Sequence, residues 1–315
     1  MDLDILLYRG EQFNSNFYYF SNCDIDHSFF LLKDEKRYLF VPRMNERRAE
    51  EEFDGEIIVY KDIKEIKKYA GDKINCDFSS LSANLYLKLN KLFTIKDISE
   101  QLLQTRMVKS SEEVELIKKA TEISKNIFAN IDFSEMKTEM DVKHYLLAST
   151  LEQNVEPAFN PIVATDKNSA LPHYEPGDVK LGSMVLVDYA VKYKNYCSDL
   201  TRCFFLKRDK RKEEAYESAR LIFYDLIDAI PNLKTGKQLA LLSEKLFKKA
   251  KLPSLIHSIG HGVGLDVHEF PRLSKKFNDN LSGAILAIEP AVYFKDFGVR
   301  YEETLYFDGK TVKVL

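Results

Sequence analysis

From residue 109 onward, the sequence predicts the same order of elements twice, two helices followed by two strands. Each helix pair has an amphipathic pattern that must bury one stripe, and capping boxes at Ser110 and Thr235 mark two of the helix starts. Strand-like runs follow the helix pairs at 184–191, 199–206, 284–288 and 300–307. Elements in this order favour one curved antiparallel sheet backed by helices, with a cleft where the two halves meet.

A change of pattern near residue 109 predicts a domain boundary. Residues 1–108 mix short strand-like runs with charged segments, whereas long helical patterns begin after them. A chain of 315 residues that is 45% hydrophobic is long enough for about two domains. We therefore expect an α/β (α+β) protein with a small α/β amino-terminal domain at 1–108 and a larger domain at 109–315.

Charge and hydropathy argue against two classes of partner. The 46 basic residues nearly balance the 49 acidic ones, which leaves a formal charge of −3, so no bulk field attracts nucleic acid or an anionic membrane. No window approaches 18 uninterrupted apolar residues, and Met1-Asp2-Leu3-Asp4 lacks the basic and apolar segments of a signal peptide. We expect a cytoplasmic protein that binds neither nucleic acid nor membrane.

Two acidic residues directly follow strongly apolar strand-like runs. Asp188 follows Met-Val-Leu-Val, and Glu289 follows Ala-Ile-Leu-Ala-Ile. Such a carboxylate either reaches water at the strand end or must be paired, hydrogen-bonded or metal-bound, because a lone buried charge is very costly. Asp199 and Glu302 lie in the neighbouring strand-like runs. Each half of the larger domain therefore contributes two acids from adjacent strands.

Three of the six histidines, His257, His261 and His268, lie in one glycine-rich segment. Glycines let the backbone come close to a bound group, and imidazoles supply metal ligands and acid–base groups near neutral pH. Four carboxylates and an imidazole suit two hard or borderline cations such as Mn²⁺, because the four negative charges would repel each other strongly without them. Two such cations about 4 Å apart can share a hydroxide, which is a nucleophile at neutral pH.

These residues stand in motifs that resemble those of the pita-bread metallopeptidases, and within that family the Xaa-Pro peptidases, prolidase and aminopeptidase P. Asp188 and Asp199 keep the family's spacing after V-x-x-D, and residues 260–269 resemble G-H-G-x-G-L-x-x-H-E. Residues 288–290 read I-E-P, and residues 299–303 resemble V-R-I-E-D. The resemblance covers roughly residues 106–315 and implies five metal ligands, Asp188, Asp199, His261, Glu289 and Glu302.

The family resemblance also implies a fold, a cofactor and a reaction. It implies a pita-bread domain after a small creatinase-like domain, with two divalent cations per chain, Mn²⁺ as first choice and Co²⁺, Fe²⁺ or Zn²⁺ as alternatives. Asp188 would bind one cation, and His261 and Glu289 the other. Asp199 and Glu302 would bridge them. A hydroxide shared by both cations would then attack the peptide bond, and Glu289 would move its proton.

Further residues resemble the family's substrate site. His173, His257 and His268 match histidines that bind substrate, stabilise the oxyanion and carry a proton. Arg300, two residues before Glu302, resembles a partner of the first acidic ligand, although a surface arginine in a strand would give the same pattern.

Two features indicate which branch of the family the chain resembles, namely the domain that precedes the ligands and one arginine. Methionine aminopeptidases share the ligand set but commonly lack the preceding domain, and the R-x-x-K-S-x-x-E sequence at 106–113 resembles the Xaa-Pro branch. The short chain favours prolidase over aminopeptidase P. Arg272 resembles a prolidase residue that contacts the dipeptide's carboxylate, although a surface salt bridge would explain it equally well.

Pita-bread folds also include a different class of protein, namely non-catalytic binding modules and the metal-free amidinohydrolase creatinase. Those proteins lose metal ligands, whereas this chain retains all five positions, which favours catalysis. The expected partner is a small peptide with proline after the scissile bond. The resemblance also implies a homodimer.

Overall fold

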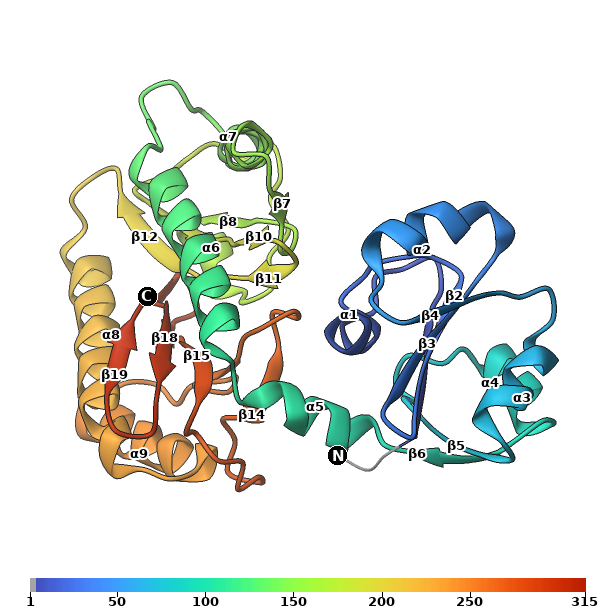
Figure 1. The fold of residues 1–315 in the computed structure, drawn as a ribbon. Helices are drawn as coiled ribbons and strands as arrows, with labels where there is room; N and C mark the ends of the chain where they lie inside the picture. The colour runs from blue at the N-terminus through green and yellow to red at the C-terminus, as the bar shows by residue number, and fades with distance from the viewer. Residues whose placement is uncertain (1–3) are drawn as a thin grey trace. The chain divides into compact units, whose positions relative to one another are not determined.

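The computed structural model describes residues 4–315, so Met1-Asp2-Leu3, on which the signal-peptide argument partly rests, lies outside the described residues. The chain divides into two compact units, Met1–Arg106 and Met107–Leu315. Each unit has its own sheets and hydrophobic cores (Figure 1). Within residues 4–315, no helix is long and apolar enough to cross a bilayer.

The amino-terminal unit is built on a six-stranded mixed sheet with the order β4-β3-β2-β1-β5-β6. Alternate residues of β1 enter different cores, because successive side chains of a strand point to opposite faces. Ile5 and Leu7 pack in one core and Leu6 in the other, so both faces of the sheet are covered. The strands are β1 (Ile5–Arg9), β2 (Ser28–Lys33), β3 (Lys36–Val41), β4 (Glu56–Val59), β5 (Lys73–Cys76) and β6 (Thr94–Asp97). The α-helices are α1 (Ser15–Ser21), α2 (Glu46–Glu52), α3 (Lys67–Ala70), α4 (Ala83–Asn90) and α5 (Ser99–Met107).

The carboxy-terminal unit contains two helix pairs and a set of short antiparallel strands. The capping boxes expected at Ser110 and Thr235 are present and open the first helix of one pair and the second helix of the other. The helices are α6 (Ser111–Ala129), α7 (Glu139–Glu152), α8 (Lys210–Ala229) and α9 (Gly236–Lys249). The strands of the first half are β7 (Glu156–Pro157), β8 (Ile162–Thr165), β9 (Met184–Asp188), β10 (Val191–Tyr193), β11 (Tyr196–Cys197) and β12 (Thr201–Phe205). The strands of the second half are β13 (Gly260–Gly262), β14 (Glu269–Arg272), β15 (Ala284–Ile288), β16 (Ala291–Tyr293), β17 (Gly298–Arg300), β18 (Glu303–Phe307) and β19 (Val312–Val314).

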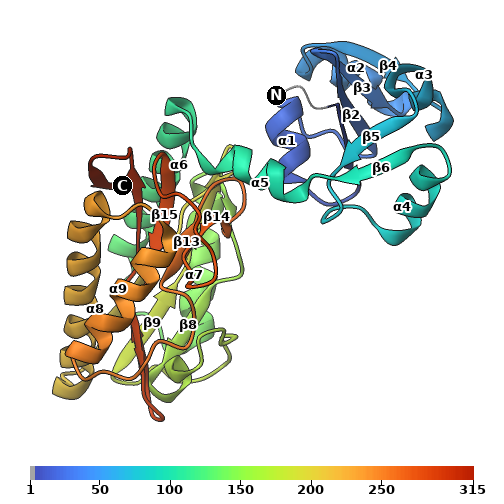
Figure 2. The same cartoon turned by 90° about the horizontal axis from the view of Figure 1, so that it is seen from below.

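Two antiparallel sheets form the centre of this unit, with the orders β12-β9-β8 and β14-β13-β15-β18-β19. A single antiparallel bridge between Thr201 and Glu302 connects them. Alternate residues of β9 pack against different helix pairs, Met184 with the core of α8 and α9 and Val185 with the core of α6 and α7. Helices α8 and α9 contact each other, as Figure 2 shows, and pack in one core with strands β15 and β18.

The expected fold class, antiparallel sheet backed by helices after a smaller α/β unit, is confirmed, but the central strands form two sheets joined by one bridge and not one continuous sheet. Three of the expected strand-like runs are shorter than their sequence patterns. The run at 199–206 forms only β12, Thr201–Phe205. The run at 184–191 is interrupted after Asp188, and in the run at 300–307 the strand β18 begins only at Glu303. The chain turns away from the ladder at the acidic residues, which places their side chains at strand ends.

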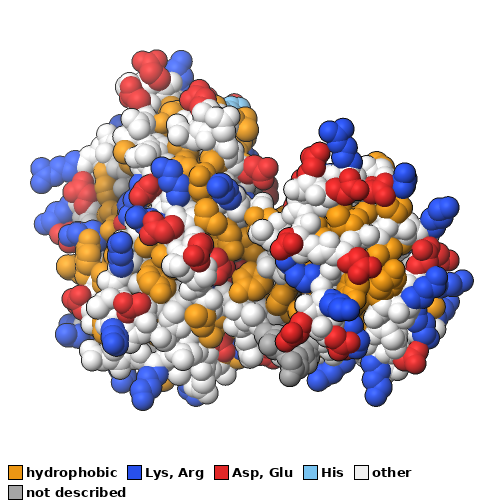
Figure 3. Space-filling model, in the orientation of Figure 1, with side chains coloured by type: hydrophobic (Ala, Val, Ile, Leu, Met, Phe, Trp, Pro, Cys, Tyr) orange, Lys and Arg blue, Asp and Glu red, His pale blue; other side chains and the backbone are white. Residues whose placement is uncertain are grey.

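The surface carries both signs of charge. On the face drawn in Figure 3, acidic and basic side chains are interspersed. This distribution matches the nearly balanced composition.

Candidate metal centre

The five residues expected as ligands come from five separate segments of the carboxy-terminal unit. Asp188 ends β9, Asp199 lies between β11 and β12, and His261 is the middle residue of β13. Glu289 directly follows β15, and Glu302 directly precedes β18. All five line one cavity of about 610 Å³ beside the bridge that connects the two central sheets.

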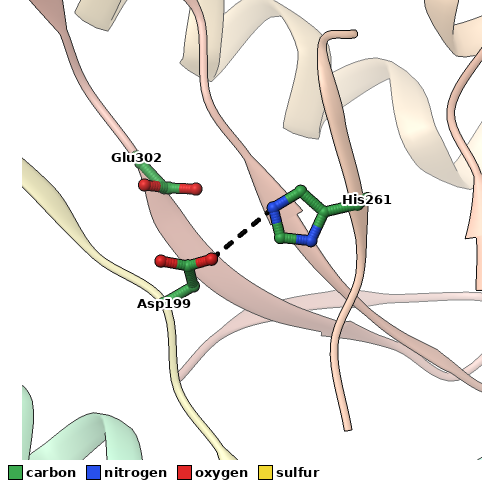
Figure 4. A group of neighbouring side chains, drawn as sticks. All are labelled: Asp199, His261 and Glu302. Carbon is green, nitrogen blue, oxygen red and sulfur yellow. Dashed lines mark ion pairs between the residues drawn. The ribbon is translucent and has the colours of Figure 1, made fainter. Parts of the chain in front are cut away.

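Asp199, His261 and Glu302 are the most tightly grouped of these side chains. One potential ligand atom from each lies within 4.8 Å of the other two, and the three side chains point toward one another (Figure 4). All three are buried. The structure therefore brings together two carboxylates and an imidazole from distant parts of the sequence.

His261 presents an unprotonated nitrogen to this group. Its Nδ1 lies 3.1 Å from the carbonyl oxygen of Gly262, and because a carbonyl only accepts, Nδ1 carries the hydrogen. Its Nε2 faces Asp199 Oδ2 at 3.5 Å and Glu289 Oε1 at 3.9 Å. Burial lowers the pKa of His261 to about 3, so the ring is neutral at pH 7. Nε2 and the two carboxylates thus offer lone pairs to one another, which is the arrangement that a cation stabilises.

The carboxylates of the site also repel one another. Burial, followed by the charge of Glu302, raises the pKa values of Asp199 and Glu289 well above the ordinary range. Burial and the charge of Asp188 raise the pKa of Glu302 to about 7. Burial also raises the pKa of Asp188, against the opposing charge of Arg300. These shifts identify a site that needs more positive charge than the arginine provides.

Two buried oxygens show that the residues fit divalent cations. Asp188 Oδ1 and Asp199 Oδ1 have almost no contact with solvent and no hydrogen-bond partner. A buried carboxylate oxygen without a partner is costly, and coordination removes that cost. Four carboxylates with one imidazole form the donor set expected for Mn²⁺ and similar ions. The five residues are therefore able to hold divalent metal.

Arg300 is buried and belongs to the site. Its guanidinium donates hydrogen bonds to Asp188 Oδ2 and, at 3.0 Å, to Thr201 Oγ1. The Thr201 hydroxyl in turn donates to Glu302 Oε2 at 2.5 Å. Sequence analysis missed Thr201, because its role depends on the pairing of Asp188 opposite Thr201 between β9 and β12. A sequence pattern does not fix that register.

Tyr293 is a second residue that sequence analysis missed. Arg300 donates to the Tyr293 hydroxyl oxygen at 3.1 Å, and that hydroxyl lies 3.0 Å from His257 Nε2. His257 Nδ1 donates to the Ser258 carbonyl at 2.7 Å, and burial lowers the pKa of His257 to about 4. The neutral ring must therefore accept from Tyr293, which fixes its tautomer. The only sequence signal was the tyrosine that closes Glu-Pro-Ala-Val-Tyr after the I-E-P motif.

The three histidines expected at the substrate site line the same cavity. His173, His257 and His268 all contribute to its wall. The His268 ring packs 4.2 Å from the His261 ring, measured between centroids, and burial lowers the pKa of His268. His257 Nδ1 also lies 3.6 Å from Glu289 Oε2. The structure therefore brings these histidines around the carboxylate cluster.

Arg272 is placed differently. It lies opposite His261 in the pairing of β13 with β14, one strand from the cluster, but does not line the cavity. Its guanidinium forms a bidentate pair with Asp279, at 2.8 Å through Nε and 2.9 Å through a terminal nitrogen. The rings of Phe270 and Phe277 flank it at 4.1 and 3.6 Å. In this structure Arg272 therefore forms the salt bridge that was the alternative explanation.

Comparison with known proteins agrees with this geometry. The model described as "Metallopeptidase family M24" matches residues 115–308, and that described as "Creatinase/Prolidase N-terminal domain" matches residues 4–108. An uncharacterised peptidase of Methanocaldococcus jannaschii is 36% identical over 294 residues, 87% of this chain and 80% of the relative. The Xaa-Pro dipeptidase of Pyrococcus furiosus is 30% identical over 316 residues, 95% of this chain and 90% of the relative.

Solved structures give the same result. The prolidase from Pyrococcus furiosus superimposes with a TM-score of 0.87 at 26% identity, over 100% of this chain and 96% of that one. The X-Pro aminopeptidase from Thermotoga maritima superimposes with a TM-score of 0.88 at 25% identity, over 99% of this chain and 95% of that one. The fold is thus the pita-bread fold expected from the motifs, and M24 membership implies divalent metal ions. With a creatinase-type amino-terminal domain followed by a catalytic domain, the chain belongs to metallopeptidase family M24.

Proposed function

We propose that this metallopeptidase hydrolyses the bond before proline in small peptides, with Xaa-Pro dipeptides as its main substrates. The observation that carries the proposal is a cluster of four carboxylates, three of them buried and that of Glu289 partly buried, which lines a cavity of about 610 Å³ together with the neutral His261. Relatives that span nearly the whole chain are named Xaa-Pro dipeptidases. A cavity of this size suits a small peptide.

The proposed roles of the ligands are those that the family resemblance implies. Asp188 would hold one cation, His261 and Glu289 would hold the second, and Asp199 and Glu302 would be shared between them. When bound, the cations supply an activated water and positive charge for the developing oxyanion. Glu289, whose carboxylate also faces His257, takes the proton of the attacking water.

The surrounding side chains position the substrate. His173, His257 and His268 contact the peptide, stabilise the oxyanion and return a proton to the leaving amine. Burial lowers the pKa of His257 and keeps its ring neutral. The hydrogen stays on Nδ1, because the Ser258 carbonyl only accepts and because Arg300, which only donates, leaves the Tyr293 hydroxyl to donate to Nε2. His257 therefore enters the reaction in one tautomer.

Several finer properties belong to the same proposal. The native metal is Mn²⁺, with Co²⁺, Fe²⁺ and Zn²⁺ as substitutes, and two ions bind per chain. Residues 1–108 form a separate amino-terminal domain and residues 109–315 the catalytic domain. The protein acts in the cytoplasm.

A homodimer is expected in solution, on the basis of the family resemblance. Multi-angle light scattering should give a mass of about twice 36.5 kDa. A mass near 36.5 kDa across the working concentration range would reject the dimer.

Substrate preference is tested with a panel of Xaa-Pro dipeptides and Xaa-Pro-Xaa tripeptides, assayed with Mn²⁺, Co²⁺ and Zn²⁺. We expect dipeptides to be cleaved about tenfold to a hundredfold faster in kcat/KM, ~1 to 3 kcal/mol, because the Arg272 guanidinium, one strand from the cluster, would exchange its partner Asp279 for a carboxylate placed directly on proline. Arg272→Ala should remove most of this preference. Asp279→Asn is the matched variant, since it frees the guanidinium from its present partner and should preserve or increase the preference.

Aminopeptidase P activity on longer peptides is the second candidate, and the pairing of Arg272 with Asp279 favours it. A guanidinium already neutralised by a carboxylate attracts a substrate carboxylate less strongly. If the wild type cleaves tripeptides as well as dipeptides, or better, the second candidate replaces the first. If purified protein binds no metal and gains no activity with Mn²⁺, the non-catalytic binding module replaces both.

A further inference from the structure

The sequence R-x-x-K-S-x-x-E at 106–113 contains a lysine that the proposed reaction does not use. Lys109 is buried in the carboxy-terminal unit, and its Nζ lies 3.3 Å from Glu269 Oε2. Only 1% of the lysine side chain and 2% of the glutamate side chain are exposed. A buried ion pair of this kind is retained at the cost of removing both charges from water, so its role calls for an explanation beyond stability.

The other end of this ion pair belongs to the loop that carries His268. Glu269 directly follows His268, and its second oxygen, Oε1, accepts the backbone N–H of Asp266 at 2.9 Å. The carboxylate therefore closes the loop 263–268 on itself. At Gly264, a Cβ atom would lie 2.4 Å from Glu269 Oε2, so the loop leaves space for this carboxylate and for little else.

The same loop is attached to the segment that carries Asp199. The backbone N–H of Cys197, two residues before Asp199, donates to the Gly264 carbonyl at 2.8 Å. On the other side, the backbone N–H of Lys109 donates at 2.8 Å to the carbonyl of Gly283, which directly precedes β15. Lys109 is thus fixed at its backbone to the strand that leads to Glu289 and at its ammonium to the loop of His268.

Glu113, the last residue of the motif at 106–113, forms a second contact with this part of the site. Glu113 Oε2 accepts the Ser110 N–H at 2.8 Å in the capping box, and Glu113 Oε1 accepts the Tyr196 hydroxyl at 3.1 Å. Tyr196 precedes Cys197 in β11. The motif residues Lys109 and Glu113 therefore hold two neighbouring segments of the site from the start of α6.

We propose that Lys109 is a positioning residue for His268, acting through the Glu269 carboxylate and its hydrogen bond with the Asp266 N–H. The lysine holds the carboxylate, and the carboxylate holds the loop at the point where the His268 side chain enters the cavity. Neither side chain contacts the substrate. The inference rests on the proposed function only for its turnover readout.

Three variants separate positioning from stability. Lys109→Met removes the ammonium that lies against the buried Glu269 carboxylate and should lower both the melting temperature and kcat. Lys109→Met with Glu269→Met removes both charges and should recover most of the melting temperature, because an apolar pair replaces a buried ion pair at little cost. Turnover should stay low in this double variant, about tenfold to a hundredfold below wild type, because the Asp266 N–H has lost the Glu269 oxygen.

Lys109→Met with Glu269→Gln is the conservative rescue, since the glutamine oxygen still accepts the Asp266 N–H. It should recover both the melting temperature and most of the lost turnover. In all variants KM should stay within about threefold and metal content should be unchanged, because the affected step is turnover rather than binding. If the Met–Met variant regains wild-type kcat, or if the Met–Gln variant does not regain it, the proposal is overturned.

A variant that keeps both charges provides a second route if the Met–Met protein does not fold. Gly264→Ala pushes a methyl group against the Glu269 carboxylate and should lower kcat without loss of metal. Wild-type kcat in this variant would also overturn the proposal.

A spectroscopic readout makes the test independent of the substrate assignment. In spectra of the zinc-loaded full chain, the ring ¹H–¹³C resonance of His268 is assigned as the one that is absent from the spectrum of His268→Ala. It should shift in the Met–Met variant and return toward its wild-type position in the Met–Gln variant. If the wild type cleaves no peptide of the panel, the proposed function fails while this resonance still decides whether Lys109 positions His268.

Discussion

Asp199→Asn is expected to abolish measurable peptidase activity and to lower the metal content of the purified protein. Asp199 lies within 4.8 Å of ligand atoms of both His261 and Glu302, and its burial leaves no water to replace a lost charge. Asparagine keeps the volume but removes one negative charge from between the proposed cations. We expect a loss of about a thousandfold or more in kcat, as for other groups that act on the developing charge. Metal analysis and peptide hydrolysis measure the two effects separately.

Glu303→Gln is the matched control for the ligand assignment. Glu303 adjoins Glu302, but its carboxylate forms ion pairs with Lys125 and Arg202, away from the cluster. The variant should keep its metal even if it loses some stability, whereas Glu302→Gln should lose metal. Should Glu303→Gln lose metal while Glu302→Gln retains it, the register assumed for this segment is wrong. Near-normal turnover in Asp199→Asn would show that Asp199 is not one of the metal ligands.

His268→Ala and His261→Ala are expected to fail in different ways. The two rings pack against each other, yet only His261 turns an unprotonated Nε2 toward the carboxylates. His261→Ala should lose metal and activity together. His268→Ala should fold, keep its metal and lose about a hundredfold to a thousandfold in kcat, the range for a group that stabilises an oxyanion or carries a proton.

The control for the histidine pair is His144→Ala, which changes an exposed histidine of α7 and should leave both measurements unchanged. Isothermal titration with Mn²⁺ and peptide assays distinguish the two site variants. Equal loss of metal in both would contradict the separate roles of ligand and proton carrier.

Much of the fold could be predicted because its signals are local. The capping boxes at Ser110 and Thr235 and the apolar stripes of the long helices depend on residues three or four positions apart. The short strands β13, β14, β16 and β17 were not predicted. They contain three or four residues each, too few for a period of two to emerge. Pairing stabilises them, β13 with β14 and β15, and β16 with β17.

The site could be predicted in its residue types but not in its contacts. Asp188 and Glu289 stand out because a carboxylate ends a run of buried apolar residues, which is visible without any structure. Thr201 and Tyr293 could not be found in this way, because their importance depends on strand register and on a hydrogen bond to His257. The pairing of Arg272 with Asp279 was hidden for the same reason, since it depends on the path of the chain between the two residues.

The bridge between Thr201 and Glu302 has a thermodynamic consequence. It is the one place in residues 4–315 where the two central sheets pair, and it lies among carboxylates that repel one another. Cations that bind there would stabilise the conformation in which the two central sheets are joined, and not one in which they are separated. Metal binding and the association of the two sheets are therefore linked by mass action. Removal of metal by a chelator would then separate the two sheets at the Thr201–Glu302 bridge before either half unfolds. Protease cleavage in the segment between the halves would increase before cleavage within them.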